Sequence, residues 1–182
     1  MNKDDLDIFN NIPPFGNYFR EVYNKKWFRI HSLYNGKRYS DSEIENKEIL
    51  LRNQTVFNKI MNGEIVGFLT AFDSSLESQN KQWINSLDLH YFTTYDIAED
   101  EDNEYLVDAY YFILNKSKLN DSMILDIAGD DFDGELLFYS LNTGNIFAPY
   151  DGGIDLIIEN SKELIKCKKY FSKWLSNRKD GL

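Results

Sequence analysis

Nucleophilic catalysis would require a thiol or hydroxyl beside a histidine, and the chain has two histidines and one cysteine. His31 and His90 are far apart in the sequence, and each falls in a predicted strand. Cys167 lies in a lysine-rich predicted helix, where a structural thiol is the commoner explanation. Strand alternation places Arg29 and His31 on one face and Ser32 on the other, so these residues form no triad. We therefore predict that the protein is not an enzyme.

Three aspartates, Asp130, Asp131 and Asp133, precede a glycine and suggest a calcium loop. An EF-hand needs an acid at its first position and a glutamate at its twelfth. Alignment on the glycine puts Gly129 and Ser140 at those positions, so the motif fails and a surface turn explains the aspartates better. The sequence also lacks a Walker loop, a dinucleotide-binding motif and zinc-ligand spacing. We expect neither a metal nor a cofactor, although a looser metal site that uses Asp151 and Asp155 stays open.

The elements that would position these residues follow from hydrophobic spacing. After a loosely ordered lead-in over residues 1–14, the pattern predicts one α+β domain that spans residues 1–182. Its sheet is mainly antiparallel or mixed, and it is packed by a long helix at about 41–62 and a C-terminal helix at about 161–177. Shorter helices are predicted at 15–23 and 120–128, and strands at 26–33, 64–72, 87–95, 106–114, 135–140, 146–149 and 154–158.

We expect the rest of the fold to be arranged around the C-terminal unit over residues 131–175. Two strands are joined by a turn with the sequence Asn-Thr-Gly-Asn, which is typical of a hairpin. A corner at Asp151, Gly152 and Gly153 then leads into a third strand, and we expect this corner to need positive φ angles. The aspartates that flank the glycines make a phosphate cradle a poor explanation for the pair.

Charge is distributed unevenly along the chain, whose net charge is −10. Residues 60–161 carry 20 acidic and three basic side chains, a local charge of −17, whereas residues 20–59 and 162–182 carry +4 and +5. This balance argues against nucleic acid as a direct partner, because phosphate binding needs a concentrated basic surface. A basic protein fits better, since an acidic field speeds its encounter. An acidic surface kept for solubility explains the charge equally well.

The predicted partner-binding residues are the acids of a loop at 96–104 and of the turn at 130–133. They are Asp96, Glu99, Asp100, Glu101, Asp102, Glu104, Asp130, Asp131 and Asp133.

No apolar run reaches roughly 18 residues, so we expect no membrane contact. The N-terminus has no secretory signal, and the lone cysteine fits a reducing compartment, so the predicted location is the cytoplasm.

Two stretches resemble an uncharacterised bacterial family whose members carry W-x-R-I-H-S-L-P followed by K-R-Y, and P-Y-D-G-G-x-D followed by W-L-S. The matching residues here are 27–33, 37–39, 149–155 and 174–176, and Tyr34 stands where the pattern has proline. That family has no settled activity to transfer. The order strand, Thr-Gly turn, strand, Gly-Gly corner, strand, helix is also similar to the SUKH-type immunity superfamily.

The SUKH-type resemblance implies a non-enzymatic immunity protein that neutralises a cognate bacterial toxin, often a nuclease, by binding its basic active-site surface. The acidic character and the missing catalytic set agree with that hypothesis. The alternative is a small ligand-binding or enzymatic domain whose pocket is formed by Arg29, His31, Asp151 and Asp155. A cleft converging on those four residues would favour the alternative, and a flat surface would count against it.

Overall fold

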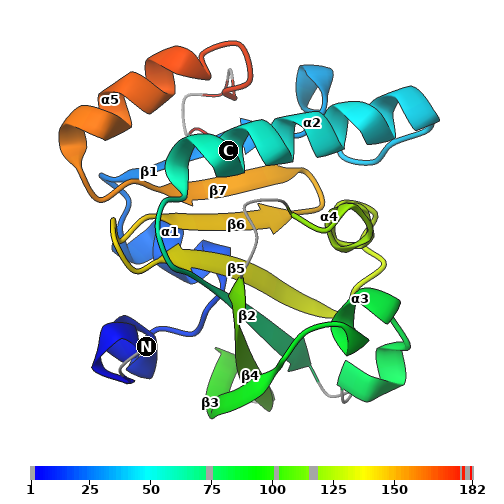
Figure 1. The fold of residues 1–182 in the computed structure, drawn as a ribbon, viewed down its shortest axis with the longest axis vertical. Coiled ribbons are helices and arrows are strands. Elements are labelled where there is room, and N and C mark those ends of the chain that lie inside the picture. The colour runs from blue at the N-terminus through cyan, green and yellow to red at the C-terminus, as the bar shows by residue number, and fades with distance from the viewer. Residues whose placement is uncertain are drawn as a thin grey trace.

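Within the residues that the structure describes, 3–72, 76–100, 103–114, 119–176, 178 and 181, seven strands form one antiparallel sheet. Figure 1 shows this computed structural model. The strand order is β1-β7-β6-β5-β2-β4-β3, so β1 and β3 are the two edges. The strands are β1 (Trp27–His31), β2 (Ile65–Phe72), β3 (His90–Asp100), β4 (Asn103–Leu114), β5 (Gly134–Ser140), β6 (Ile146–Tyr150) and β7 (Gly153–Ile157). The predicted α+β class is confirmed.

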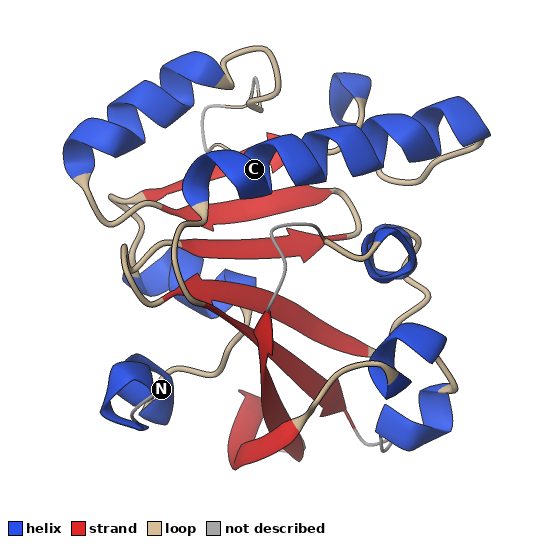
Figure 2. Cartoon of the chain, in the orientation of Figure 1, coloured by secondary structure: helices blue, strands red, loops and turns tan. Residues whose placement is uncertain are grey.

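Helices cover both faces of the sheet (Figure 2). One face is covered by α2 (Glu43–Ile60), α4 (Asp121–Ala128) and α5 (Ser161–Tyr170). On the other face, α1 (Gly16–Val22) packs against β6 and β7, and the 3₁₀ helix η1 (Lys3–Asn10) adds to the same apolar cluster. Three shorter elements complete the described fold: η2 (Tyr34–Gly36), η3 (Leu76–Gln79) and α3 (Gln82–Asn85). None of the described helices has the length and apolar character needed to cross a bilayer.

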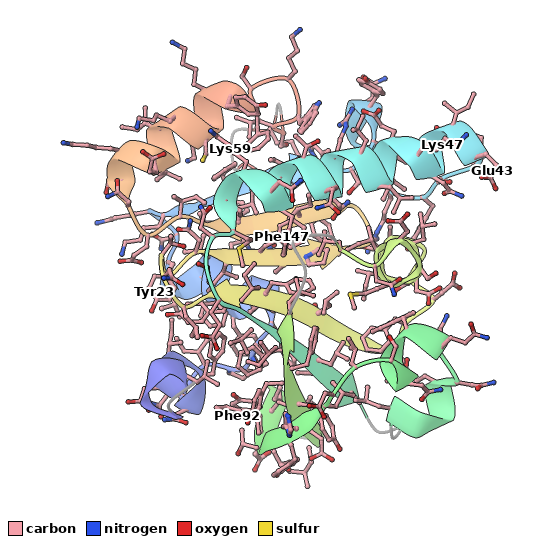
Figure 3. The ribbon with its side chains drawn as sticks, in the orientation of Figure 1. Tyr23, Glu43, Lys47, Lys59, Phe92 and Phe147 are labelled. Atoms are coloured by element: carbon pink, nitrogen blue, oxygen red, sulfur yellow. The ribbon has the colours of Figure 1, made fainter. Side chains whose placement is uncertain are left out.

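Helix α2 follows the prediction for residues 41–62 closely. Ser42 caps it by accepting a hydrogen bond from the Glu45 backbone N–H, and acids occupy its first turn, where they suit the helix dipole. Its buried stripe includes Phe57, whose ring meets Phe138 and Phe147 edge-on at 5.4 and 5.3 Å. Phe147 lies between α2 and the sheet in Figure 3. These ring contacts hold α2 against the sheet.

Strand β1 places its charged residues on the face opposite α2. Phe28 and Ile30 are buried in the α2 core, so Arg29 and His31 project to the α1 side. The register pairs Arg29 with Asp155 of β7 and His31 with Gly153. The two strands therefore bring together residues that the sequence separates by more than 120 positions.

The prediction of a loosely ordered lead-in over residues 1–14 is wrong for the described part of that segment. Residues 3–10 form η1, in which Leu6 and Phe9 are 1% and 0% exposed. Phe9 stacks against Phe68 at a ring distance of 4.2 Å, and its carbonyl accepts a hydrogen bond from the Tyr95 hydroxyl. Two apolar residues at helical spacing among many polar ones were enough to anchor the segment.

The predicted acidic loop over residues 96–104 is largely strand, so the prediction that the strand ends near residue 95 is corrected. β3 extends to Asp100 and β4 begins at Asn103. The reason is the period-two pattern: Tyr95 and Ile97 are buried, and Asp96 between them is exposed. Glu101 and Asp102 lie outside the described residues, as do the side chains of Glu99, Asp100 and Glu104.

The C-terminal helix is shorter than predicted. α5 ends at Tyr170 rather than near residue 177, and the chain turns at 171–174. Leu175 then forms an isolated antiparallel bridge with Ile30, and the Trp174 carbonyl accepts a hydrogen bond from the His31 backbone N–H at 2.9 Å. The last described segment thus lies along the outer edge of β1.

Candidate functional site

A cavity of about 910 Å³ opens at the His31 end of β1. Its walls come from four parts of the chain: β1 with the loop that follows it, helix α2, the β6–β7 turn and the segment after α5. Its basic lining residues are Arg29, His31, Arg38, Arg52, Lys173 and Arg178, and its aromatic ones are Tyr34, Tyr150 and Trp174. Asp151 is the one acid among the described residues that line it. In a chain of net charge −10, this is a local concentration of positive charge.

Arg29 is held rigidly by Asp155. Its Nε and Nη2 atoms donate to the two carboxylate oxygens at 2.8 Å each, and its guanidinium stacks on the Tyr150 ring at 4.3 Å. Burial opposes its charge, but the hydrogen bonds and charge of Asp155 raise the pKa of Arg29. Asp155 also accepts from Trp27 Nε1 at 3.0 Å and lies 3.9 Å from Arg20. Asp155 is therefore engaged by three side chains and positions Arg29, instead of serving as an open metal ligand or base.

Arg52 reaches the cavity from the inner face of α2 and is 1% exposed. Its Nε donates to Glu48 at 2.6 Å, and its Nη1 donates to the His31 carbonyl at 2.9 Å. The guanidinium lies between the rings of Tyr34 and Trp174, at 4.4 and 5.2 Å from their centroids. Its third nitrogen, Nη2, is buried and has no hydrogen-bond acceptor among the described residues. Such an orphaned donor is uncommon in a native fold and calls for an acceptor.

His31 lies between these two arginines. Partial burial and the positive charges of Arg29 and Arg52 lower the pKa of His31, while a hydrogen bond with the Gly152 backbone opposes that shift. Gly36 of η2 approaches the ring from the other side: a side chain there would begin 3.7 Å from the imidazole. The imidazole is therefore neutral at pH 7 and acquires charge only at lower pH or when an anion offsets the arginines.

The mouth of the cavity is formed by Arg38, Lys173 and the β6–β7 turn. Arg38 is paired with Asp151, which also accepts a hydrogen bond from the Tyr39 hydroxyl at 3.0 Å. Lys173 is exposed and forms no ion pair with the described residues. Its ammonium group, on a flexible stem, can adjust to a ligand more readily than a stacked guanidinium can.

The glycine corner works differently from the prediction. Neither Gly152 nor Gly153 has a positive φ, which corrects that expectation. A Cβ on Gly153 would lie 2.1 Å from the Ile30 carbonyl oxygen, and one on Gly152 would lie 2.9 Å from the Tyr150 ring. Close approach to the β1 backbone excludes a side chain at Gly153, and close approach to the Tyr150 ring disfavours one at Gly152, so backbone handedness is not the reason for either glycine.

The arrangement of charged groups in the cavity suits anion binding. The described residues contain no cluster of three or more His, Cys, Asp or Glu side chains that could hold a metal ion. Cys167 is buried on the inner face of α5, where burial raises the pKa of its thiol and so disfavours the reactive thiolate. What the cavity offers is a set of fixed cations and one unsatisfied N–H group.

The structure brings together most of the residues of the alternative pocket hypothesis. Arg29, His31 and Asp151 line the cavity, and Asp155 lies behind Arg29. The segments that resemble the uncharacterised family, residues 27–33, 37–39, 149–155 and 174–176, all contribute residues to the cavity or to its supporting contacts. Sequence reasoning missed Arg52, Tyr34, Trp174 and Lys173 as site residues. The available signal was an arginine three positions after Ile49 and four before Val56, on the buried stripe of α2.

The predicted partner-binding acids do not line the cavity, and they lie on separate elements, although the charge of Asp130 helps to raise the pKa of Arg38 at the cavity. Asp96 is exposed on β3, at the sheet edge opposite the cavity, and Asp130, Asp131 and Asp133 are exposed in the turn between α4 and β5. These two groups lie at different places in Figure 1. Their role in binding a partner stays a prediction.

The chain was compared with known proteins. No curated protein and no solved structure matches it. One family model, described as a domain of unknown function (DUF3885), matches residues 15–179, which include every described cavity residue. Because that match covers most of the chain, the protein belongs to the DUF3885 family.

Proposed function

We propose that this protein is a binding domain that holds an anionic ligand in the cavity at the end of β1. The observation that carries the proposal is Arg52 Nη2, a buried donor without an acceptor, in a cavity where Asp151 is the single acid among the described lining residues. A buried N–H group without a partner costs about 1–3 kcal/mol. Nη2 has almost no accessible surface, so an oxyanion would supply the missing acceptor, and recover that free energy, once the exposed Tyr34 ring that stacks on the guanidinium moves aside.

The size of the cavity supports a small organic ligand. Small-molecule pockets typically measure 300–1,000 Å³ and combine apolar walls with a few fixed polar groups. The cavity of about 910 Å³ falls within that range, and its rings of Tyr34, Tyr150 and Trp174 provide apolar surface. The same three rings stack on Arg29 and Arg52, so the cations are preorganised before any ligand arrives.

The test is isothermal titration calorimetry of the full chain with inorganic phosphate, succinate and citrate, and with neutral glycerol. We expect saturable binding of at least one anion and no binding of glycerol. Lys173→Gln should weaken that binding several-fold, because it removes an exposed cation at the cavity mouth. Lys162→Gln is the matched control, since Lys162 is exposed on α5 and does not line the cavity. The proposal fails if no anion binds, or if both variants weaken binding equally.

A second candidate function is the inhibition of a bacterial toxin through the acidic surface. The observation in its favour is that Asp96, Asp130 and Asp131 are exposed and form no ion pair with the described residues. Unpaired surface acids leave a field that attracts a basic partner and speeds association. This proposal agrees with the similarity to SUKH-type immunity proteins and needs no catalytic residue.

Co-expression with the toxin candidate from the adjacent reading frame tests the inhibitor proposal. The wild-type chain should protect the host cell, and Asp130→Lys with Asp131→Lys should lose protection and slow association. Glu21→Lys with Glu64→Lys, at two exposed positions outside the acidic turn, makes the same change of +4 in net charge and is the control. Full protection by the double variant, with an unchanged salt dependence of the association rate, would rule out this surface as the interface.

A further inference from the structure

We infer that the anionic group held in the cavity is a phosphate, carried by a small organic molecule. The inference rests on the proposed ligand-binding function and assigns its ligand class. It follows from the direction of the free donors, from the charge left after internal pairing, and from the volume that remains beside a phosphate.

The free donors are single nitrogens that come from different elements. Asp155 occupies the Nε and Nη2 atoms of Arg29, which leaves its Nη1 end. Glu48 and the His31 carbonyl occupy Nε and Nη1 of Arg52, which leaves Nη2. A planar carboxylate is matched best by two parallel N–H groups of one guanidinium. Separate donors from β1 and α2, with the Lys173 ammonium at the mouth, better match the three oxygens of a tetrahedral phosphate.

The charge balance also fits a dianion. Arg29, Arg38 and Arg52 are each paired with one acid, namely Asp155, Asp151 and Glu48. Lys173 forms no ion pair with the described residues, Arg20 shares Asp155 with Arg29, and Arg178 adds a further cation to the lining. Protonation of His31 would add to this positive charge. A phosphate monoester carries about −1.5 to −2 charges at pH 7, so it offsets more of this charge than a singly charged anion does.

Binding of a dianion should therefore be coupled to protonation of His31. The charged groups that act on its imidazole are Arg29 on β1 and Arg52 on α2; Gly152 contributes a backbone hydrogen bond and Gly36 contributes only packing. A bound phosphate would offset both arginines, so His31 would take up a proton and affinity would rise as pH falls from 8 towards 6. The cavity, with a volume of about 910 Å³, has room for an organic group beside the phosphate.

The test uses phenyl phosphate, benzoate and succinate, with histidine side-chain NMR of the full chain as the readout. Phenyl phosphate and benzoate share a ring, and succinate matches the phosphate in charge. We expect phenyl phosphate to shift the His31 ring signals saturably and to raise the pKa of His31. The signals of His90, on the opposite sheet edge, should not move. Benzoate and succinate should bind at least about tenfold more weakly, the factor that corresponds to 1.4 kcal/mol.

Two lysine variants test the same assignment. Lys173→Gln, at an exposed position, should weaken phenyl phosphate several-fold and leave the fold intact, whereas Lys162→Gln should change nothing. If succinate or benzoate binds as tightly as phenyl phosphate, the phosphate assignment is overturned and the proposed anion-binding function stands. If none of the three moves the His31 signals, both are overturned.

Discussion

At the scale of single residues, the cavity depends most on Arg52. It is a fully buried cation on a helix face that otherwise contacts the core, and its bonds tie α2 to β1 through the His31 carbonyl. Replacement of a buried ion-pair partner usually costs several kcal/mol, because the remaining charge loses its compensation. Glu48 keeps partial solvent contact, with 22% of its side chain exposed, which reduces that penalty.

We predict that Arg52→Gln lowers the free energy of unfolding by about 2–3 kcal/mol. Urea denaturation followed by circular dichroism measures the change. Lys37→Gln is the control, since Lys37 pairs with Asp41 and Glu45 at the surface and its loss should leave the midpoint unaltered. Equal changes in the free energy of unfolding for both substitutions would mean that the buried Arg52–Glu48 pair stabilises the fold no more than a surface pair does.

Glu135 gives a second residue-scale prediction, on pH. Burial, together with the charges of Asp155, Asp151 and Asp130, raises the pKa of Glu135 to about 7. The folded state therefore binds a proton that the unfolded state has already lost between pH 4.5 and 7. The stability that Glu135 contributes is complete below that window and is lost as pH rises through 7. Glu135→Gln should thus be more stable than wild type at pH 8, by up to about 3 kcal/mol, and similar to it near pH 4.5.

Urea midpoints of the two proteins across pH 4.5–8 check this prediction, and only their difference is used because other groups also titrate. A difference that is constant across the series would show that Glu135 is ionised in the folded protein throughout.

At the scale of elements, the sequence predicted where each helix and strand lies better than it predicted where each one ends. The stripe from Ile49 to Ile60 specified α2, and the hairpin and glycine corner specified β5 to β7. The predicted ends of α5 and β3 were wrong because tertiary contacts, and not the local hydrophobic pattern, determine where these two elements end. α5 stops at Tyr170 because Trp174 and Leu175 are needed at Arg52 and at the edge of β1. β3 continues past Tyr95 because Ile97 has a buried place on the sheet.

The glycine corner yields the element-scale prediction. Gly153→Ala would place a methyl group 2.1 Å from the Ile30 carbonyl oxygen, and the backbone of β1 cannot yield without losing its register with β7. We expect a loss of about 3 kcal/mol or more in the free energy of unfolding. Gly152→Ala meets only the Tyr150 ring, which can move, so it should cost less stability while weakening ligand binding through Arg29.

Thermal and urea unfolding of both alanine variants, with calorimetric titration of the ligand, separate these effects. If Gly152→Ala is the more destabilising of the two, the close approach of β1 is not the main reason that this corner requires glycine.

At the scale of the whole molecule, the cavity forms where the two net-positive segments of the chain meet. Residues 20–59 and 162–182 supply all of its basic lining, and the acidic middle of the chain supplies Asp151. The sequence displays this segregation of charge, but it could not show that β1 pairs with β7 and carries the last segment along its edge. Arg29, His31, Asp151 and Asp155 could be proposed together from the sequence, whereas Arg52 required the packing of α2 over β1.

The same geometry predicts that anion binding in the cavity is separable from a role of Asp96 in binding a partner. The cavity and Asp96 lie at opposite edges of a seven-stranded sheet. The distance between the two edges is about six strand spacings, or roughly 29 Å. The Debye length at physiological ionic strength is about 8 Å, so their charges act independently.

Asp96→Lys should therefore leave the affinity for an anion within about twofold of wild type at 0.15 M salt. The same substitution should slow association with a basic partner, and Lys173→Gln should do the reverse. Calorimetry and stopped-flow association of the two variants measure both quantities. A fall in anion affinity with Asp96→Lys would mean that the two edges are coupled through the sheet itself.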